Sequence, residues 1–328
     1  MAGVQGSALA IAVSGAGARL AALRDAHGRS DPRAEVEAIR AASARPFNLN
    51  FFCHRPAPPD AQREQAWRLL LARYYEELGI DPAAIASAPV RAPFSPALAA
   101  LVEELRPPVV SFHFGLPAPE LMARVKRSGA KVLSSATTVE EALYLQAGGV
   151  DAVIAQGLEA GGHRGMFLGE DMSTQLGTFA LLRRCRRRGG CSGDCGRRHR
   201  RRAGWPRRWR SGRPGAGRQH LPAVPRGGHQ HGAPRLAQEP GRGPPAVTNL
   251  FSGRPARAIV NRLVAELGPI NAAVPPFPHA GAALAPLRAA AEAHGAGDFS
   301  PLWCGQNPLG CRELPAATLT RALFEAGA

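Results

Sequence analysis

The segment at residues 154–166, IAQGLEAGGHRGM, holds the residue types best suited to chemistry. An apolar run ends at Gln156, and a glycine-rich turn that includes Gly161 and Gly162 then delivers His163. Histidine titrates near neutral pH, so it can serve as a general base or acid. A glutamine amide can hydrogen-bond the edge of a heterocycle, and glycines without a Cβ let the backbone approach a flat or phosphorylated ligand. The alternative is a surface turn with an incidental histidine.

Short β-rich runs alternate with helix-like segments along the chain up to this turn. Such βα units predict a parallel sheet with right-handed crossovers. In a parallel barrel, the active site is built at the carboxyl ends of the strands, where this turn would lie. Apolar strands without polar alternation fit either a doubly wound sheet or a (β/α)8 barrel. The expected strands are residues 47–52, 108–114, 131–135 and 151–156, and the expected helices are residues 61–78, 119–128, 138–146, 257–267, 282–294 and 316–324.

Length and composition indicate a folded chain and exclude a mainly disordered one. The 328 residues are 45% hydrophobic, which is enough for a sizeable core. No apolar run reaches the ~18 residues that a membrane span needs. The six cysteines are scattered, and we expect free thiols in a reducing compartment. The sequence therefore predicts a cytoplasmic protein, and no metal site is expected.

The formal net charge of +16 comes from one arginine-rich stretch. Residues 183–242 hold eighteen arginines and only two acidic residues. This stretch has almost no apolar periodicity, so it does not predict buried strands. As a genuine insert it would suit nucleic-acid binding through phosphate contacts, with Trp205 and Trp209 available for stacking. It divides the chain into residues 1–182, an arginine-rich window at residues 183–245, and residues 246–328, whose pattern is largely helical.

Four further phrases accompany QGLEAGGHRG, namely MAG at the start, PFNLNFF, VTNLFSGRPAR and SPLWCGQN. In this order they resemble the nitronate monooxygenases, formerly called 2-nitropropane dioxygenases. The resemblance covers residues 1–17, 34–182 and 246–328. It implies an FMN-dependent (β/α)8 TIM-type barrel with a helical C-terminal part. The implied reaction is the oxidation of an alkyl nitronate or nitroalkane by O2 to a carbonyl compound and nitrite.

The resemblance also implies roles for single residues. His163 matches the family's active-site histidine, beside the flavin N5 edge. It would remove the α-proton of a neutral nitroalkane, or it would hold a preformed nitronate anion. Trp303 matches a segment near the cofactor. The residues that match FMN contacts are Met1, Ala2, Gly3, Asn50, Gln156, Gly161, Gly162 and Gln306.

Two stretches depart from the family pattern. GARLAALRDAH stands where the family reads GGLGSL, and the family's phosphate-binding strand ends are missing from the arginine-rich window. A reading frame shifted by one base in residues 18–31 and 183–245 would restore these motifs and explain the arginine excess. We therefore expect the chain as written to form an incomplete barrel and to hold FMN poorly. Because the family's first strand precedes MAG, we also expect an earlier start.

Two other functions stay open. A different FMN barrel, such as an NAD(P)H-dependent quinone or enoyl reductase, shares the fold and the glycine turns. Steady NAD(P)H consumption would favour that reading. A nucleic-acid-binding protein would act through the arginine-rich window and would bind oligonucleotides at moderate salt. The phrases around His163 and Trp303 favour the nitronate monooxygenase over the reductase.

Overall fold

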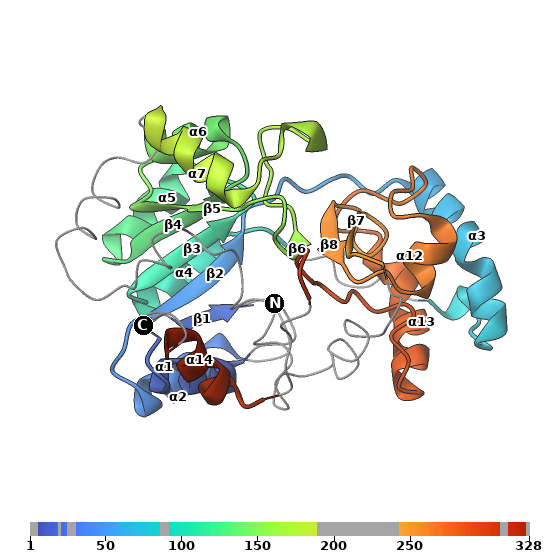
Figure 1. Cartoon of the computed structure of the whole chain (residues 1–328), viewed down its shortest axis with the longest axis horizontal. Coiled ribbons are helices and arrows are strands. Elements are labelled where there is room, and N and C mark those ends of the chain that lie inside the picture. The colour runs from blue at the N-terminus through green and yellow to red at the C-terminus, as the bar shows by residue number, and fades with distance from the viewer. Residues whose placement is uncertain are drawn as a thin grey trace.

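A five-stranded parallel sheet lies at the centre of one part of the molecule (Figure 1). In the computed structural model, the strands follow one another in the sheet in the same order as along the chain. They are β1 (Ala21–Arg24), β2 (Phe47–Phe52), β3 (Val109–His113), β4 (Lys131–Ala136) and β5 (Ala152–Ala155). The structure describes residues 6–18, 21–24, 31–85, 92–188, 243–308 and 314–325.

Helices connect these strands and flank the sheet. Several begin where a side chain caps the first turn: the Asp31 carboxylate accepts from the Arg33 amide at 3.0 Å, and the Thr138 hydroxyl accepts from the Glu141 amide at 3.2 Å. Such caps fix where each helix leaves its loop, and therefore how it returns to the sheet. The helices on this side are α1 (Ser7–Gly15), α2 (Pro32–Ala42), α4 (Pro96–Leu105), α5 (Pro119–Arg127), α6 (Val139–Ala147) and α7 (Thr178–Arg187).

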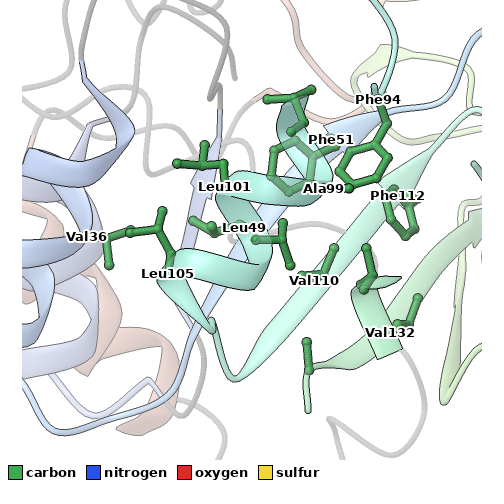
Figure 2. Packing of buried hydrophobic residues seen from close by; sticks show 14 of the residues in the cluster. Val36, Leu49, Phe51, Phe94, Ala99, Leu101, Leu105, Val110, Phe112 and Val132 are labelled. Carbon is green, nitrogen blue, oxygen red and sulfur yellow. The ribbon is translucent and has the colours of Figure 1, made fainter. Parts of the chain in front are cut away.

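The two faces of the sheet differ in polarity. Phe51, Phe94 and Phe112 pack edge to face on one side, with ring centroids 5.0 Å apart for Phe51 and Phe94 and 5.1 Å apart for Phe94 and Phe112 (Figure 2). Helices α2, α4 and α5 contribute to the same core. Because side chains alternate along a strand, Asn48 and Asn50 of β2 lie on the opposite face. The sheet therefore has an apolar face toward these helices and a polar face on the other side.

A second part of the molecule combines an early helix with the C-terminal half (Figure 1). The indole of Trp67 donates to the Ala280 carbonyl at 3.2 Å, and the Tyr75 hydroxyl donates to the Ala283 carbonyl at 2.7 Å. These bonds join α3 (Ala61–Glu77) to α13 (Gly281–Ala293). The strands β6 (Gly162–His163), β8 (Ala256–Ala258) and β7 (Ala246–Thr248) form an antiparallel sheet in that order, and Ala258 shares the core of α3 and α13. The remaining elements are η1 (Pro82–Ala84), η2 (Met172–Thr174), α12 (Arg262–Leu267) and α14 (Ala316–Glu325), which packs against α1.

The α/β class with a parallel sheet is confirmed, and all four expected strands are present. The strands in the described ranges do not close into a barrel, since β5 pairs there with β4 alone. Most of the arginine-rich window and residues 1–5 lie outside the described residues. The start of that window continues helix α7, in which Cys185 is buried.

The helix expected at residues 257–267 is wrong in its first part. Ala256–Ala258 forms strand β8, in which Arg257 pairs with Val247 of β7 and with Gly162 of β6. The helix begins only at Arg262, where the Asn261 side chain caps it by accepting from the Val264 amide. The spacing of apolar residues favours a helix here, but hydrogen bonding to β6 and β7 makes the segment a strand.

Within the described parts of the chain, none of the helices combines the length and the apolar character needed to cross a membrane. The cytoplasmic location stays a prediction.

The packing of Phe112 predicts a large effect of its removal. Its side chain is 0% exposed at the centre of the sheet core, so Phe112→Ala should lower the free energy of unfolding by about 3–5 kcal/mol. Leu69→Ala is the control, because Leu69 is 69% exposed on α3 and its loss should change stability by about 0.5 kcal/mol or less. Urea denaturation of both variants measures the difference. Equal effects would mean that this core does not form as described.

Candidate active site

His163 lies on β6 and is oriented by a distant serine. Its strand pairs antiparallel with β8, where His163 faces Ala256. The Nε2 atom of His163 is 2.8 Å from the hydroxyl oxygen of Ser252, which lies in the connection between β7 and β8. That hydroxyl is also 3.4 Å from the Arg254 carbonyl oxygen. The imidazole is thus held by a hydroxyl that can both accept and donate a hydrogen bond.

Aromatic rings from both parts of the molecule surround the imidazole of His163. Its ring centroid is 5.1 Å from that of Trp303, 5.6 Å from Phe277 and 6.0 Å from Phe114. Phe114 follows β3 directly and adopts a left-handed conformation with φ of 69°. That conformation is costly for a residue with a Cβ, and such strain is concentrated at functional sites. His163 therefore sits in a mostly apolar shell where the two parts of the molecule meet.

Gln156 holds the backbone around His163. Gln156 is buried directly after β5, where its backbone N–H donates to the Ala136 carbonyl at 2.8 Å. Its side chain donates from Nε2 to the His163 carbonyl at 2.9 Å and accepts at Oε1 from the Gly165 amide at 2.7 Å. The two sequence-predicted residues are therefore in direct contact. The Gln156 side chain thereby holds the backbone of the turn at two points. Its Nε2 and Oε1 atoms can each form one further hydrogen bond.

Arg164 is fully buried and anchors the same turn. Its guanidinium donates to the Gly157 carbonyl at 2.7 Å, to the Gln156 carbonyl at 3.0 Å and to the Gln175 side-chain oxygen at 2.7 Å. Burial lowers the pKa of Arg164 to about 10, and the nearby Arg257 contributes to the shift. The group still carries its charge at neutral pH. Sequence reasoning gave Arg164 no role, although it stands beside His163 in the same phrase.

A buried carboxylate continues this network. Glu141 accepts from the Thr137 amide at 2.6 Å, from the Thr137 hydroxyl at 2.7 Å and from the Phe167 amide at 2.6 Å. The Gln175 amide nitrogen donates to the Thr137 hydroxyl at 2.9 Å, which connects Glu141 to Arg164. The signal in the sequence is the spacing Thr138-x-x-Glu141, typical of a helix start. Glu141 extends that role by holding the segment after the turn that carries His163.

Gly161 and Gly162 allow the C-terminal segment to pack onto the turn. A Cβ on Gly161 would lie 2.6 Å from the Cys304 carbonyl carbon and 2.7 Å from the Gly305 nitrogen, while Gly162 has φ of 75°. The backbone amide of Gln306 donates to the Glu159 carbonyl at 3.0 Å, and its side chain is exposed. Close packing of two backbones therefore explains the glycine at 161.

Asn50 belongs to the polar face of the parallel sheet. Its Nδ2 atom donates to the Ser111 hydroxyl at 2.8 Å and to the Ser111 carbonyl at 3.1 Å. Asn48 donates to the same hydroxyl at 2.8 Å, and its Oδ1 atom is buried without a partner in the described part of the chain. The period-two alternation of FNLN signals this face, yet Asn48 was missed. No hydrogen bond within the described ranges joins Asn50 to the His163 turn.

The structure thus brings Gln156, Gly161, Gly162 and His163 into one turn, with the backbone of Gln306 attached to it. Met1, Ala2 and Gly3 lie outside the described residues. Ser252 was not singled out from the sequence, because nothing local marks a partner eighty-nine residues away from His163.

Comparisons with known proteins point in one direction. The family model described as Nitronate monooxygenase matches residues 1–187. A nitronate monooxygenase from Pseudomonas aeruginosa is 36% identical over 364 residues, covering 99% of this chain and 93% of the relative. Another from Paraburkholderia phytofirmans is 45% identical over 185 residues, covering 56% of this chain and 50% of the relative.

Solved structures agree with the sequence relatives. A nitroalkane oxidase from Streptomyces ansochromogenes superposes with a TM-score of 0.79 at 31% identity, covering 100% of this chain and 93% of that one. FabK from Thermotoga maritima has a TM-score of 0.60 at 18% identity, covering 99% of this chain and 89% of that one. The second likeness shows a shared fold alone.

Gly161→Ala tests the packing of the C-terminal segment on the turn. The added methyl group would meet backbone atoms, which cannot rotate away, so the variant should lose about 1–3 kcal/mol of unfolding free energy. Gly169→Ala is the matched control, because nothing lies within 4 Å of a Cβ at that position. Urea denaturation compares the two variants with the parent. If both retain the parent's stability, the close approach of Gly161 to Cys304 is refuted.

Proposed function

Because this chain belongs to the nitronate monooxygenase family, we propose that the His163 site oxidises alkyl nitronates with O2 to a carbonyl compound and nitrite. The chain is an oxidoreductase of that family. The observation that carries the proposal is the geometry of His163, held by Ser252 within an aromatic shell in the QGLEAGGHRG turn. Enclosure by apolar rings limits water at the reacting atoms.

Nitronate monooxygenases in general depend on a flavin, and we propose FMN as the cofactor. Residues of the turn and of the polar face of the sheet suit such a group. The buried Oδ1 atom of Asn48 is an acceptor that suits a ring N–H donor. Asn50 lies on the same face, and the rings of Phe114 and Trp303 offer flat apolar surfaces. Gly161, which lets the Cys304–Gly305 backbone pack onto the turn, is also proposed as an FMN contact from the family match. The further FMN contacts proposed are Met1, Ala2, Gly3, Gln156, Gly162 and Gln306.

When bound, FMN would supply the redox chemistry between substrate and O2. The chain supplies proton handling and orientation. With a neutral nitroalkane, the unprotonated imidazole of His163 takes the proton from the carbon beside the nitro group at Nδ1, the ring nitrogen that Ser252 does not contact. Ser252 can then accept from Nε2–H while its own hydroxyl donates toward the Arg254 carbonyl, so the protonated ring stays oriented. With a preformed nitronate, His163 moves no proton and instead stabilises the anion.

Nitrite release and O2 uptake test the proposal directly. The purified chain, supplied with excess FMN, should release nitrite from ethyl nitronate and consume O2, with no dependence on NAD(P)H. Excess FMN matters because the arginine-rich window lacks the family's phosphate-binding motifs. NAD(P)H consumption without nitrite would instead favour the reductase. Retention on immobilised oligonucleotides at moderate salt would favour nucleic-acid binding.

His163→Ala should separate the two kinds of substrate. Loss of the base should slow turnover of neutral nitroethane by roughly 10²-fold or more, while ethyl nitronate, which needs no deprotonation, should be slowed less. His294→Ala is the control, since His294 is an exposed histidine at the end of α13. Steady-state kinetics on both substrates and flavin absorbance give the readouts. Unchanged turnover of nitroethane would remove His163 from the mechanism.

A further inference from the structure

Arg254 stands beside the His163 site on a backbone that has little freedom to move. It follows Gly253 in the connection between β7 and β8, two residues after Ser252. Gly253 has φ of 81°, and a Cβ there would lie 2.1 Å from the Pro275 carbonyl oxygen and 2.6 Å from the Phe277 nitrogen. The backbone at Gly253 therefore packs closely against the backbone of the segment that contains Phe277. This contact fixes where the Arg254 side chain starts.

The guanidinium of Arg254 lies against the aromatic shell of the site. Its Cζ atom is 4.2 Å from the ring centroid of Phe114, the residue whose ring also neighbours His163. Its Nη2 atom donates to the Met166 carbonyl. Its Nε atom is buried and has no hydrogen-bond partner in the part of the chain that the structure describes. Burial lowers the pKa of Arg254, as expected for a cation with few compensating contacts.

Two neighbouring arginines show what a purely structural role looks like. Arg164 donates from Nε, Nη1 and Nη2 to carbonyl and amide oxygens. Arg257 likewise donates from all three nitrogens to backbone carbonyls. Arg254 differs from both, since its buried Nε has no partner in the described part of the chain. Glu170 and Glu141 are near enough to raise its pKa, but neither forms an ion pair with it among the described residues. A partly buried cation with an unused buried donor is unfavourable unless an anion accepts a hydrogen bond from that donor.

We propose that Arg254 binds the anionic nitro end of the nitronate substrate and the nitrite product. Both are planar groups that share a net charge of −1 over two oxygens, which match the flat donor array of a guanidinium. Because Nε is shielded from solvent, an anion at this atom is largely dehydrated, which strengthens a charged hydrogen bond. A neutral nitroalkane carries no net charge and gains less. The inference rests on the proposed function for its substrate, and nitrite binding tests it separately.

Nitrite is the probe, because it needs no turnover. Isothermal titration calorimetry on the FMN-loaded chain should show nitrite binding that weakens by about 10-fold or more in Arg254→Gln, the loss expected for one charge-assisted hydrogen bond. Arg254→Lys keeps the charge but loses the planar fork, so its affinity should fall between the two. Arg33→Gln is the matched control, because Arg33 pairs with Glu104 on the surface.

Kinetics give a second readout. In Arg254→Gln, KM for ethyl nitronate should rise by about 10-fold or more, while KM for nitroethane, which carries no net charge when it binds, changes by about 3-fold or less. A structural role alone would change both substrates alike. If the parent chain binds nitrite through Arg254 yet releases no nitrite from nitronates, the proposed function fails and the anion site stands.

A measurement on the parent chain keeps the proposal testable if both variants fail to fold. Nitrite should protect Arg254 from an arginine-specific dicarbonyl reagent, as mapped by peptide mass spectrometry, while modification of Arg33 stays unchanged. Chloride at the same ionic strength should give no protection. Absence of nitrite binding, affinity unchanged in a folded Arg254→Gln, or no protection of Arg254 would each overturn the proposal.

Discussion

The buried guanidinium of Arg164 is the interaction on which the geometry of the site depends. It reaches the carbonyls of Gln156 and Gly157 at the end of β5 and the side chain of Gln175 near η2. The Arg164 amide also donates to the Pro255 carbonyl at 2.8 Å, which ties the turn to the second sheet. Each buried acceptor left without this donor would cost about 1–3 kcal/mol. The two sheets therefore keep one relative arrangement near His163.

Because side chains alternate along a strand, the neighbours His163 and Arg164 make different contacts. Consecutive side chains on β6 and beyond point to opposite sides, so Arg164 reaches inward to the network while His163 meets Ser252 and the aromatic rings. Gln156 completes the arrangement by bonding the backbone on either side of Arg164. Ser252 has only to orient the imidazole, because the backbone that carries His163 is already fixed. A short strand of two residues is sufficient for this reason.

Sequence patterns predicted what depends on local periodicity and missed what depends on distant contacts. The strands β2 to β5 were predicted because short β-rich runs alternate with helix-like segments in the sequence. The QGLEAGGHRG turn was predicted because glycine and histidine have distinctive chemistry. The role of Ser252 arises only when remote segments meet, so no local signal marks it. Asn48 was missed although the alternation of FNLN marks its face, because its unpartnered Oδ1 atom is visible only in the folded structure. The segment at Arg257 was misread because its apolar spacing suits a helix, while pairing on both edges makes it a strand.

The arginines near the site are not those of the arginine-rich stretch at residues 183–242, which gives the chain its net positive charge. Arg164, Arg254 and Arg257 all lie near the turn, and burial lowers the pKa of each. The nearby carboxylates are engaged elsewhere: Glu141 binds backbone amides, and Glu159 accepts from the Thr178 amide at the start of α7 at 3.0 Å. Their guanidinium hydrogen bonds go to carbonyl and amide oxygens, while Glu141, Glu159 and Glu170 raise their pKa values through Coulombic attraction. Salt screens buried charges far less than exposed ones, so the proposed attraction between Arg254 and an anionic substrate should persist at physiological ionic strength.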